Sequence, residues 1–128
     1  MTPHATPHHF GRVQHLLLDL HACAAPLTDP ASLSQLLIEA AARSSAKVVG
    51  QARHEYTPHG LTLIVFLEES HLLLTTWPEH RFAIAEVLLC NEAMDPEPVA
   101  AWLIDALRPA RVVRHRFFHE VDPRSETG

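Results

Sequence analysis

The 128-residue sequence lacks the features that mark several specialised classes of protein. Its 10 Lys and Arg residues are outnumbered by 15 Asp and Glu residues, which gives a formal net charge of −5 with neutral histidines. This balance argues against a nucleic-acid-binding surface, because phosphate contacts need an excess of basic side chains. Only four glycines are present. None belongs to a glycine-rich phosphate loop, so an enzyme of nucleotide phosphates is also disfavoured.

Further absences concern the cellular compartment. Cys23 and Cys90 are the only two cysteines, too few for a disulfide framework. Residues 1–12 contain no apolar stretch of the kind that a signal peptide needs, and no apolar run approaches the length of a membrane span. We therefore expect a cytoplasmic protein with reduced thiols and no membrane partner.

The composition is that of a globular chain, with 47% apolar and 20% charged residues. We expect one domain over residues 13–119, a flexible Pro- and His-containing arm over residues 1–12, and a polar tail over residues 120–128. The histidines of the arm are His4, His8 and His9. They could hold a metal ion, but no Cys or carboxylate accompanies them at ligand spacing, so solvated side chains and no metal site are expected.

Apolar periodicity predicts two helices and six strands. Asp29-Pro30 and Asp95-Pro96 each suit a helix start, because Asp is a good N-cap and Pro fits the first turn. Ser44-Ser45 and Pro109 are expected to end these helices. The expected strands are 13–20, 47–56, 61–68, a run resuming at 72–74, 82–90 and 112–118. The inner faces of the helices are expected to carry Leu33, Leu36, Leu37, Ala40 and Ala41, and Val99, Trp102, Leu103, Ala106 and Leu107.

This order of elements predicts an α+β fold, a two-layer sandwich with a strand–helix–strand repeat. In it, two helices cover one face of a mostly antiparallel sheet. The strands at 61–67 and 82–89 are apolar on both sides, so the second face of the sheet is also expected to need cover. We therefore predict a homodimer that packs sheet to sheet.

One segment carries a motif longer than chance would supply. Glu69-Ser70-His71 alone would most simply be a serine at a strand end. Here it precedes Thr76-Trp77-Pro78-Glu79, and Cys90 follows the serine by twenty residues. This pattern resembles the self-cleaving core of the small prokaryotic S-adenosylmethionine decarboxylases, and the resemblance extends from about Val13 to about Arg116. The other matching segments are Leu18-Asp19-Leu20 with Cys23, His54 to Gly60, and Glu86 to Cys90.

The resemblance implies a specific chemistry. In that family the serine hydroxyl attacks the preceding carbonyl, and the resulting ester undergoes β-elimination, which leaves a pyruvoyl group at the new N-terminus. Here the products would be residues 1–69 and 70–128, with Ser70 as the pyruvoyl precursor. An imine between substrate amine and keto group then serves as the electron sink for decarboxylation. The implied reaction is decarboxylation of S-adenosylmethionine to the aminopropyl donor of spermidine synthesis.

The same resemblance implies roles for further residues. Cys90 would return a proton to the decarboxylated carbon, Glu79 would hold the ribose hydroxyls, and Tyr56, Leu72 and Trp77 would bind the substrate. Aromatic side chains suit a sulfonium because of cation–π attraction. Without the motif, Cys90 would be interpreted as an inert strand cysteine, and the two aromatic residues as ordinary core or rim positions.

Four positions depart from the family pattern. Thr75 occupies the place of the histidine that the family uses as base in the elimination. Loss of a positioned base typically costs about 10²–10⁴ in rate. Thr62 stands where the family has a serine that assists processing, and it keeps a hydroxyl. Arg81 replaces a glycine and Leu73 a small hydroxyl residue, which alters the pocket rim.

These departures keep two alternatives open. In the first, the pyruvoyl group forms but the substrate is another amino acid such as arginine or ornithine. In the second, the chain stays uncleaved and acts as a non-catalytic binding or regulatory subunit.

Overall fold

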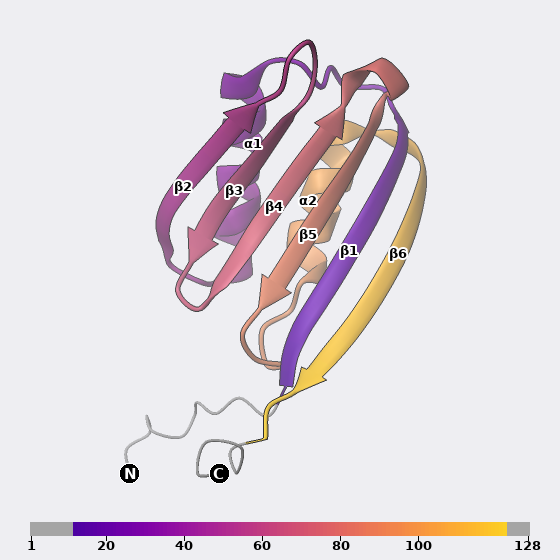
Figure 1. Cartoon of the computed structure of the whole chain (residues 1–128). Coiled ribbons are helices and arrows are strands. Elements are labelled where there is room, and N and C mark those ends of the chain that lie inside the picture. The colour runs from indigo at the N-terminus through magenta and orange to yellow at the C-terminus, as the bar shows by residue number, and fades with distance from the viewer. Residues whose placement is uncertain (1–11, 123–128) are drawn as a thin grey trace.

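The computed structural model describes residues 12–122 and contains six strands and two helices in the order expected from the sequence (Figure 1). The elements are β1 (Arg12–Cys23), α1 (Pro30–Ala41), β2 (Val48–Glu55), β3 (Leu61–Leu67), β4 (Ser70–Trp77), β5 (Phe82–Leu89), α2 (Glu97–Leu107) and β6 (Pro109–Glu120). Short 3₁₀ turns follow α1 (Ala42–Ser44) and β4 (Pro78–His80). The predicted α+β sandwich is confirmed.

All six strands form one sheet in the order β2-β3-β4-β5-β1-β6, and every neighbouring pair is antiparallel. Two connections pass through a helix. The β1–α1–β2 connection runs from an inner strand to the far edge, and β5–α2–β6 steps over β1 to the other edge. These two crossovers are the predicted strand–helix–strand repeat, and both helices lie behind the sheet in Figure 1.

The core lies between the helices and the sheet. Side chains alternate between the two faces of each central strand, as the period of two requires, and the helix-facing set is buried. Its largest fully buried members are Leu16, Leu18, Leu20, Leu72, Leu74, Val65, Val87 and Leu89, together with Leu37, Val99, Leu103 and Leu107 of the helices. Burying each such side chain stabilises the fold by about 1.5–3 kcal/mol.

No helix of residues 12–122 lies over the opposite face of the sheet, which we call the open face (Figure 1). Its side chains on the central strands are only half-buried, although many are apolar. The apolar members on β1, β3, β4 and β5 include Leu17, Ile64, Leu73, Ile84 and Leu88.

Some boundaries differ from the sequence prediction. Pro109 does not end α2 but begins β6, paired with Cys23. The helix ends one residue earlier because Arg108 adopts a left-handed conformation with φ of 49°. Pro is tolerated as the first residue of an edge strand, where its missing N–H costs little.

Most of the predicted arm and tail lies outside the described residues; within them, Arg12 begins β1 and Glu120 ends β6. In the described part of the chain, neither helix is long and apolar enough to cross a membrane.

Candidate active site

The junction predicted to be cut forms the tight turn between β3 and β4. Leu67 pairs with Ser70, so Glu68 and Glu69 alone connect the two strands. Glu69 has a φ of 60°, in the left-handed region that disfavours side chains with a Cβ. Such a conformation costs about 1–2 kcal/mol. The peptide that precedes Ser70 therefore stores backbone strain.

Ser70 begins β4 with its side chain turned toward the helices, and the residue is only 8% exposed. Its Oγ accepts a hydrogen bond from the backbone N–H of Cys90 at 3.0 Å. The register that pairs His71 with Leu88 brings the end of β5, and hence Cys90, beside the junction. We call Glu69, Ser70 and Cys90 the junction cluster.

A second group of predicted residues gathers at the other end of β4. The Tyr56 hydroxyl lies 2.9 Å from Thr62 Oγ1, which lies 3.1 Å from Thr75 Oγ1. Trp77 and Glu79 share with Tyr56 and Thr75 the lining of a pocket of about 390 Å³. We call Tyr56, Thr62, Thr75, Trp77 and Glu79 the pocket cluster.

The turn after this pocket places Arg81, one of the departures from the family pattern, in a conformation that suits glycine better. Arg81 has a φ of 49°, a conformation that glycine adopts without cost. Its carbonyl accepts a hydrogen bond from the Cys23 N–H at 2.8 Å. Burial raises the pKa of the Cys23 thiol, and the nearby Arg81 charge opposes that rise. Beside the turn, the Trp77 ring packs against Phe82 at a centroid distance of 5.4 Å.

The two clusters do not meet within one chain. Thr75 lies five residues beyond Ser70 on a continuous strand, which corresponds to about 16 Å. Trp77 lies seven residues beyond Ser70, about 23 Å away by the same rise. Leu72 is fully buried beneath the helices, so its side chain is not exposed to a ligand in this chain.

A histidine–carboxylate network on the open face was not foreseen from the sequence. His15 Nε2 and His71 Nε2 contact the same oxygen of Glu86, at 2.8 and 3.2 Å. His71 and Ser70 point to opposite faces, as expected for strand neighbours. The network joins three strands, so only the register of β1, β4 and β5 could have revealed it.

Within residues 12–122, no group of three or more His, Cys, Asp or Glu side chains is arranged to hold a metal ion. The arm histidines His4, His8 and His9 lie outside these residues.

Comparison with known proteins gives concordant similarities. Residues 14–119 match the profile of the family described as S-adenosylmethionine decarboxylase. An S-adenosylmethionine decarboxylase proenzyme of Thermodesulfovibrio yellowstonii is 38% identical over 93 residues, which cover 72% of this chain and 69% of the relative. A proenzyme of the same name from Parasynechococcus marenigrum is 35% identical over 84% of each chain.

A solved structure has the same fold. The crystal structure of the adenosylmethionine decarboxylase from Aquifex aeolicus superposes with a TM-score of 0.78, covering 89% of this chain and 95% of that one, at 24% identity.

Proposed function

The chain belongs to the S-adenosylmethionine decarboxylase family. We propose that it is a proenzyme that cuts itself between Glu69 and Ser70 and then decarboxylates S-adenosylmethionine. The product would be the aminopropyl donor of spermidine synthesis. The observation that carries the proposal is the junction cluster. A strained Glu69 precedes a serine whose hydroxyl oxygen is held by the Cys90 N–H.

The junction suits an N-to-O acyl shift followed by elimination. Ser70 Oγ would attack the Glu69 carbonyl carbon, forming an ester while the peptide C–N bond breaks and the nitrogen takes the hydroxyl proton. Loss of the Ser70 α-proton to a base would then expel the Glu69 carboxylate. Water would release the nitrogen as ammonia and leave a keto group on residue 70. Relief of strain at Glu69 favours the first step.

A pyruvoyl group at residue 70 would supply the electron sink that decarboxylation needs and that no side chain offers. The residues present fit such a group, because Ser70 stands at a chain turn beside a cysteine. Cys90 begins the loop that follows β5 and is half-buried. Its thiol is the group of the junction cluster suited to return a proton to carbon.

The pocket cluster suits an adenosyl sulfonium. The Trp77 ring offers a face for stacking and cation–π attraction, and the exposed Glu79 carboxylate can accept hydrogen bonds from two ribose hydroxyls. Arginine and ornithine are cations that a carboxylate and an aromatic face also attract, but they carry no ribose hydroxyls and no adenine for these groups to hold. Together with the family match, this pocket therefore favours S-adenosylmethionine over the changed-substrate alternative.

A homodimer would bring the two clusters together. The open face carries many apolar side chains beside its histidine–carboxylate network, and no described segment covers it; Phe66 and Phe117 at its ends are 43% and 50% exposed. In such a dimer two open faces would pack on each other about a two-fold axis that lies between them and is perpendicular to β4. The strands of one protomer would then run opposite to those of its partner. The Ser70 end of one β4 then lies over the Trp77 end of the partner's β4. Cleavage would detach residue 70 from Glu69 and allow the new terminus to turn toward that face.

In such a dimer the Thr62 and Thr75 hydroxyls of one protomer would serve the junction of the other. Their mutual hydrogen bond, with Tyr56 behind them, forms a chain of three hydroxyls. These three hydroxyl groups can orient water or the ester carbonyl, although a hydroxyl is a far weaker base than the histidine that Thr75 replaces.

The intact mass of the purified protein tests cleavage directly. Two fragments with boundaries at 69 and 70 are expected, the second blocked to Edman sequencing, whereas Ser70→Ala should stay as one chain. Carbon-dioxide release from S-adenosylmethionine, with arginine and ornithine as comparisons, tests the substrate. A wild-type chain that stays whole would instead support the non-catalytic alternative, and turnover of arginine or ornithine alone would support the changed substrate.

A further inference from the structure

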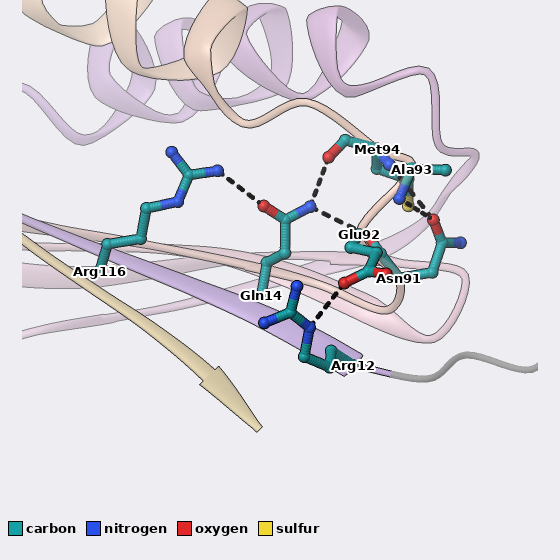
Figure 2. Close-up of polar contacts among 7 residues, drawn as sticks. All are labelled: Arg12, Gln14, Asn91, Glu92, Ala93, Met94 and Arg116. Carbon is teal, nitrogen blue, oxygen red and sulfur yellow. Dashed lines mark hydrogen bonds and ion pairs between the residues drawn. The ribbon is translucent and has the colours of Figure 1, made fainter. Parts of the chain in front are cut away.

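Gln14 is a buried polar side chain that the chemistry above does not use. It lies on the helix-facing side of β1 and is only 2% exposed. Its Nε2 donates hydrogen bonds to two backbone carbonyls of the loop after β5, those of Asn91, at 3.0 Å, and Met94 (Figure 2). A buried amide with both donors satisfied is costly to replace, since the carbonyls it serves would be left unpaired.

The orientation of this amide is set from the other side. Arg116 of β6 donates from Nη2 to Gln14 Oε1 at 2.9 Å, as Figure 2 shows. A guanidinium has only donors, so the amide oxygen must face Arg116 and the amide N–H groups must face the loop. Arg116 is in turn near Glu97, with its Nη1 3.6 Å from the carboxylate. The loop is thus tied through β1 to β6.

Asn91 makes hydrogen bonds within the loop that Gln14 contacts. The Asn91 Oδ1 accepts hydrogen bonds from the backbone N–H groups of Ala93 and Met94, at 2.9 and 3.2 Å. Its Nδ2 lies 3.8 Å from the Cys90 Sγ. Met94 Sδ lies 3.9 Å from the same sulfur. The atoms around the Cys90 thiol therefore belong to the segment that Gln14 fixes.

We propose that Gln14 is a positioning residue for Cys90. Its two hydrogen bonds hold the loop so that the Cys90 thiol stays between Asn91 and Met94 while the Cys90 N–H reaches Ser70 Oγ. The part of this inference that concerns catalysis rests on the proposed function, in which Cys90 is the proton donor. The part that concerns the thiol's surroundings depends only on the hydrogen bonds described.

The chain offers matched controls. Figure 2 shows that Arg12 Nε contacts Glu92 of the same loop. The two atoms are 2.7 Å apart, and the side chains are 41% and 49% exposed. Exposed ion pairs of this kind contribute little, so Arg12→Ala removes a loop contact without freeing the loop. Leu37→Ala opens the core in α1, on the opposite half of the sheet, and controls for general loss of stability.

The test compares Gln14→Leu and Gln14→Glu with these controls, below the melting temperature of every variant. Leu removes all three hydrogen bonds at similar size, and Glu keeps the acceptor for Arg116 but has no N–H donors. The first readout is the rate at which iodoacetamide modifies Cys90, followed by intact mass. The second is the split between kcat and KM for decarboxylation.

Both Gln14 variants should raise the rate of Cys90 modification by about tenfold, the order expected for losing a buried hydrogen bond. The kcat should fall by about tenfold while KM changes little, since the groups proposed to bind the adenosyl part of the substrate belong to the pocket cluster, which Gln14 does not contact. Arg12→Ala and Leu37→Ala should match the wild type in both readouts.

Wild-type modification rates in the Gln14 variants, or an equal rise in Leu37→Ala, would overturn the inference. These outcomes are independent of the proposed function. A wild-type protein that neither cleaves nor decarboxylates would refute that function, while the modification rates would still decide what Gln14 does.

Discussion

Two inactive variants that restore each other's activity would show that each active site is shared between protomers. Ser70→Ala removes the nucleophile from the junction cluster, and Glu79→Gln removes the carboxylate from the pocket cluster. These positions lie at the start of β4 and in the turn that follows it, and the strand between them is about 23 Å long. A ligand pocket of even about 1,000 Å³ is only about 12 Å across. One substrate cannot therefore bridge both clusters of a single protomer.

The expected activity of the mixture follows from random pairing of the two variant chains. An equal mixture contains about one half heterodimers, each with one site built from an intact junction cluster and an intact pocket cluster. The mixture should therefore show about a quarter of wild-type activity. Glu79→Gln alone should lose at least about tenfold, because charge-assisted hydrogen bonds are lost, so the mean of the two parents is at most about 5%.

Co-expression with two affinity tags, followed by carbon-dioxide release from S-adenosylmethionine, measures this difference. Ser70→Ala paired with Cys90→Ser is the control, since both changes damage the junction cluster and no heterodimer site is intact. A Ser70→Ala and Glu79→Gln mixture with only the mean activity of its parents would refute the shared site.

Three further predictions concern the junction and the cysteines. Thr75→His should accelerate cleavage by about 10²–10⁴, since it restores a base, and an unchanged time course of fragment formation on denaturing gels would contradict this. In the uncleaved Ser70→Ala background, Glu69→Gly should raise the free energy of unfolding in urea by about 1 kcal/mol, because the strain of the left-handed conformation disappears. Glu68→Gly is the control and should not raise it, since Glu68 has no such strain. Iodoacetamide at pH 8 should modify Cys90 and spare Cys23, because burial raises the pKa of the Cys23 thiol. Both cysteines should react in urea. Modification of Cys23 in the native protein at the same rate as Cys90 would be inconsistent with its burial.

The fold was predictable from the sequence because local signals agreed with the tertiary structure. The apolar run of residues 13–20 marked a strand, which lies within β1, and Asp29-Pro30 marked a helix that does begin at Pro30. Side-chain periodicity and capping act over a few residues, so a single sequence suffices to see them.

The geometry of the site was less predictable. Ser70, Thr75 and Trp77 are close in sequence, which suggested one site, but an extended strand separates them. Conversely, Gln14 and Asn91 are 77 residues apart, and only the β1–β5 register joins them. Pairing register depends on the whole sheet, and no local pattern reports it.

The position of the Glu69–Ser70 turn within the sheet determines whether the chain must fold before it is cut. A cut there would leave β1, α1, β2 and β3 in one fragment and β4, β5, α2 and β6 in the other. Given the strand order β2-β3-β4-β5-β1-β6, the fragments interleave, and three of the five strand pairings join one to the other.

Neither piece contains a complete sheet, so separating them means unfolding both. Folding must precede cutting, because the uncut chain closes these pairings within one molecule, at the high effective concentration that a covalent connection provides. Once cut, the two pieces must find each other in solution, so refolding after denaturation should slow on dilution, whereas refolding of the uncut protomer should not.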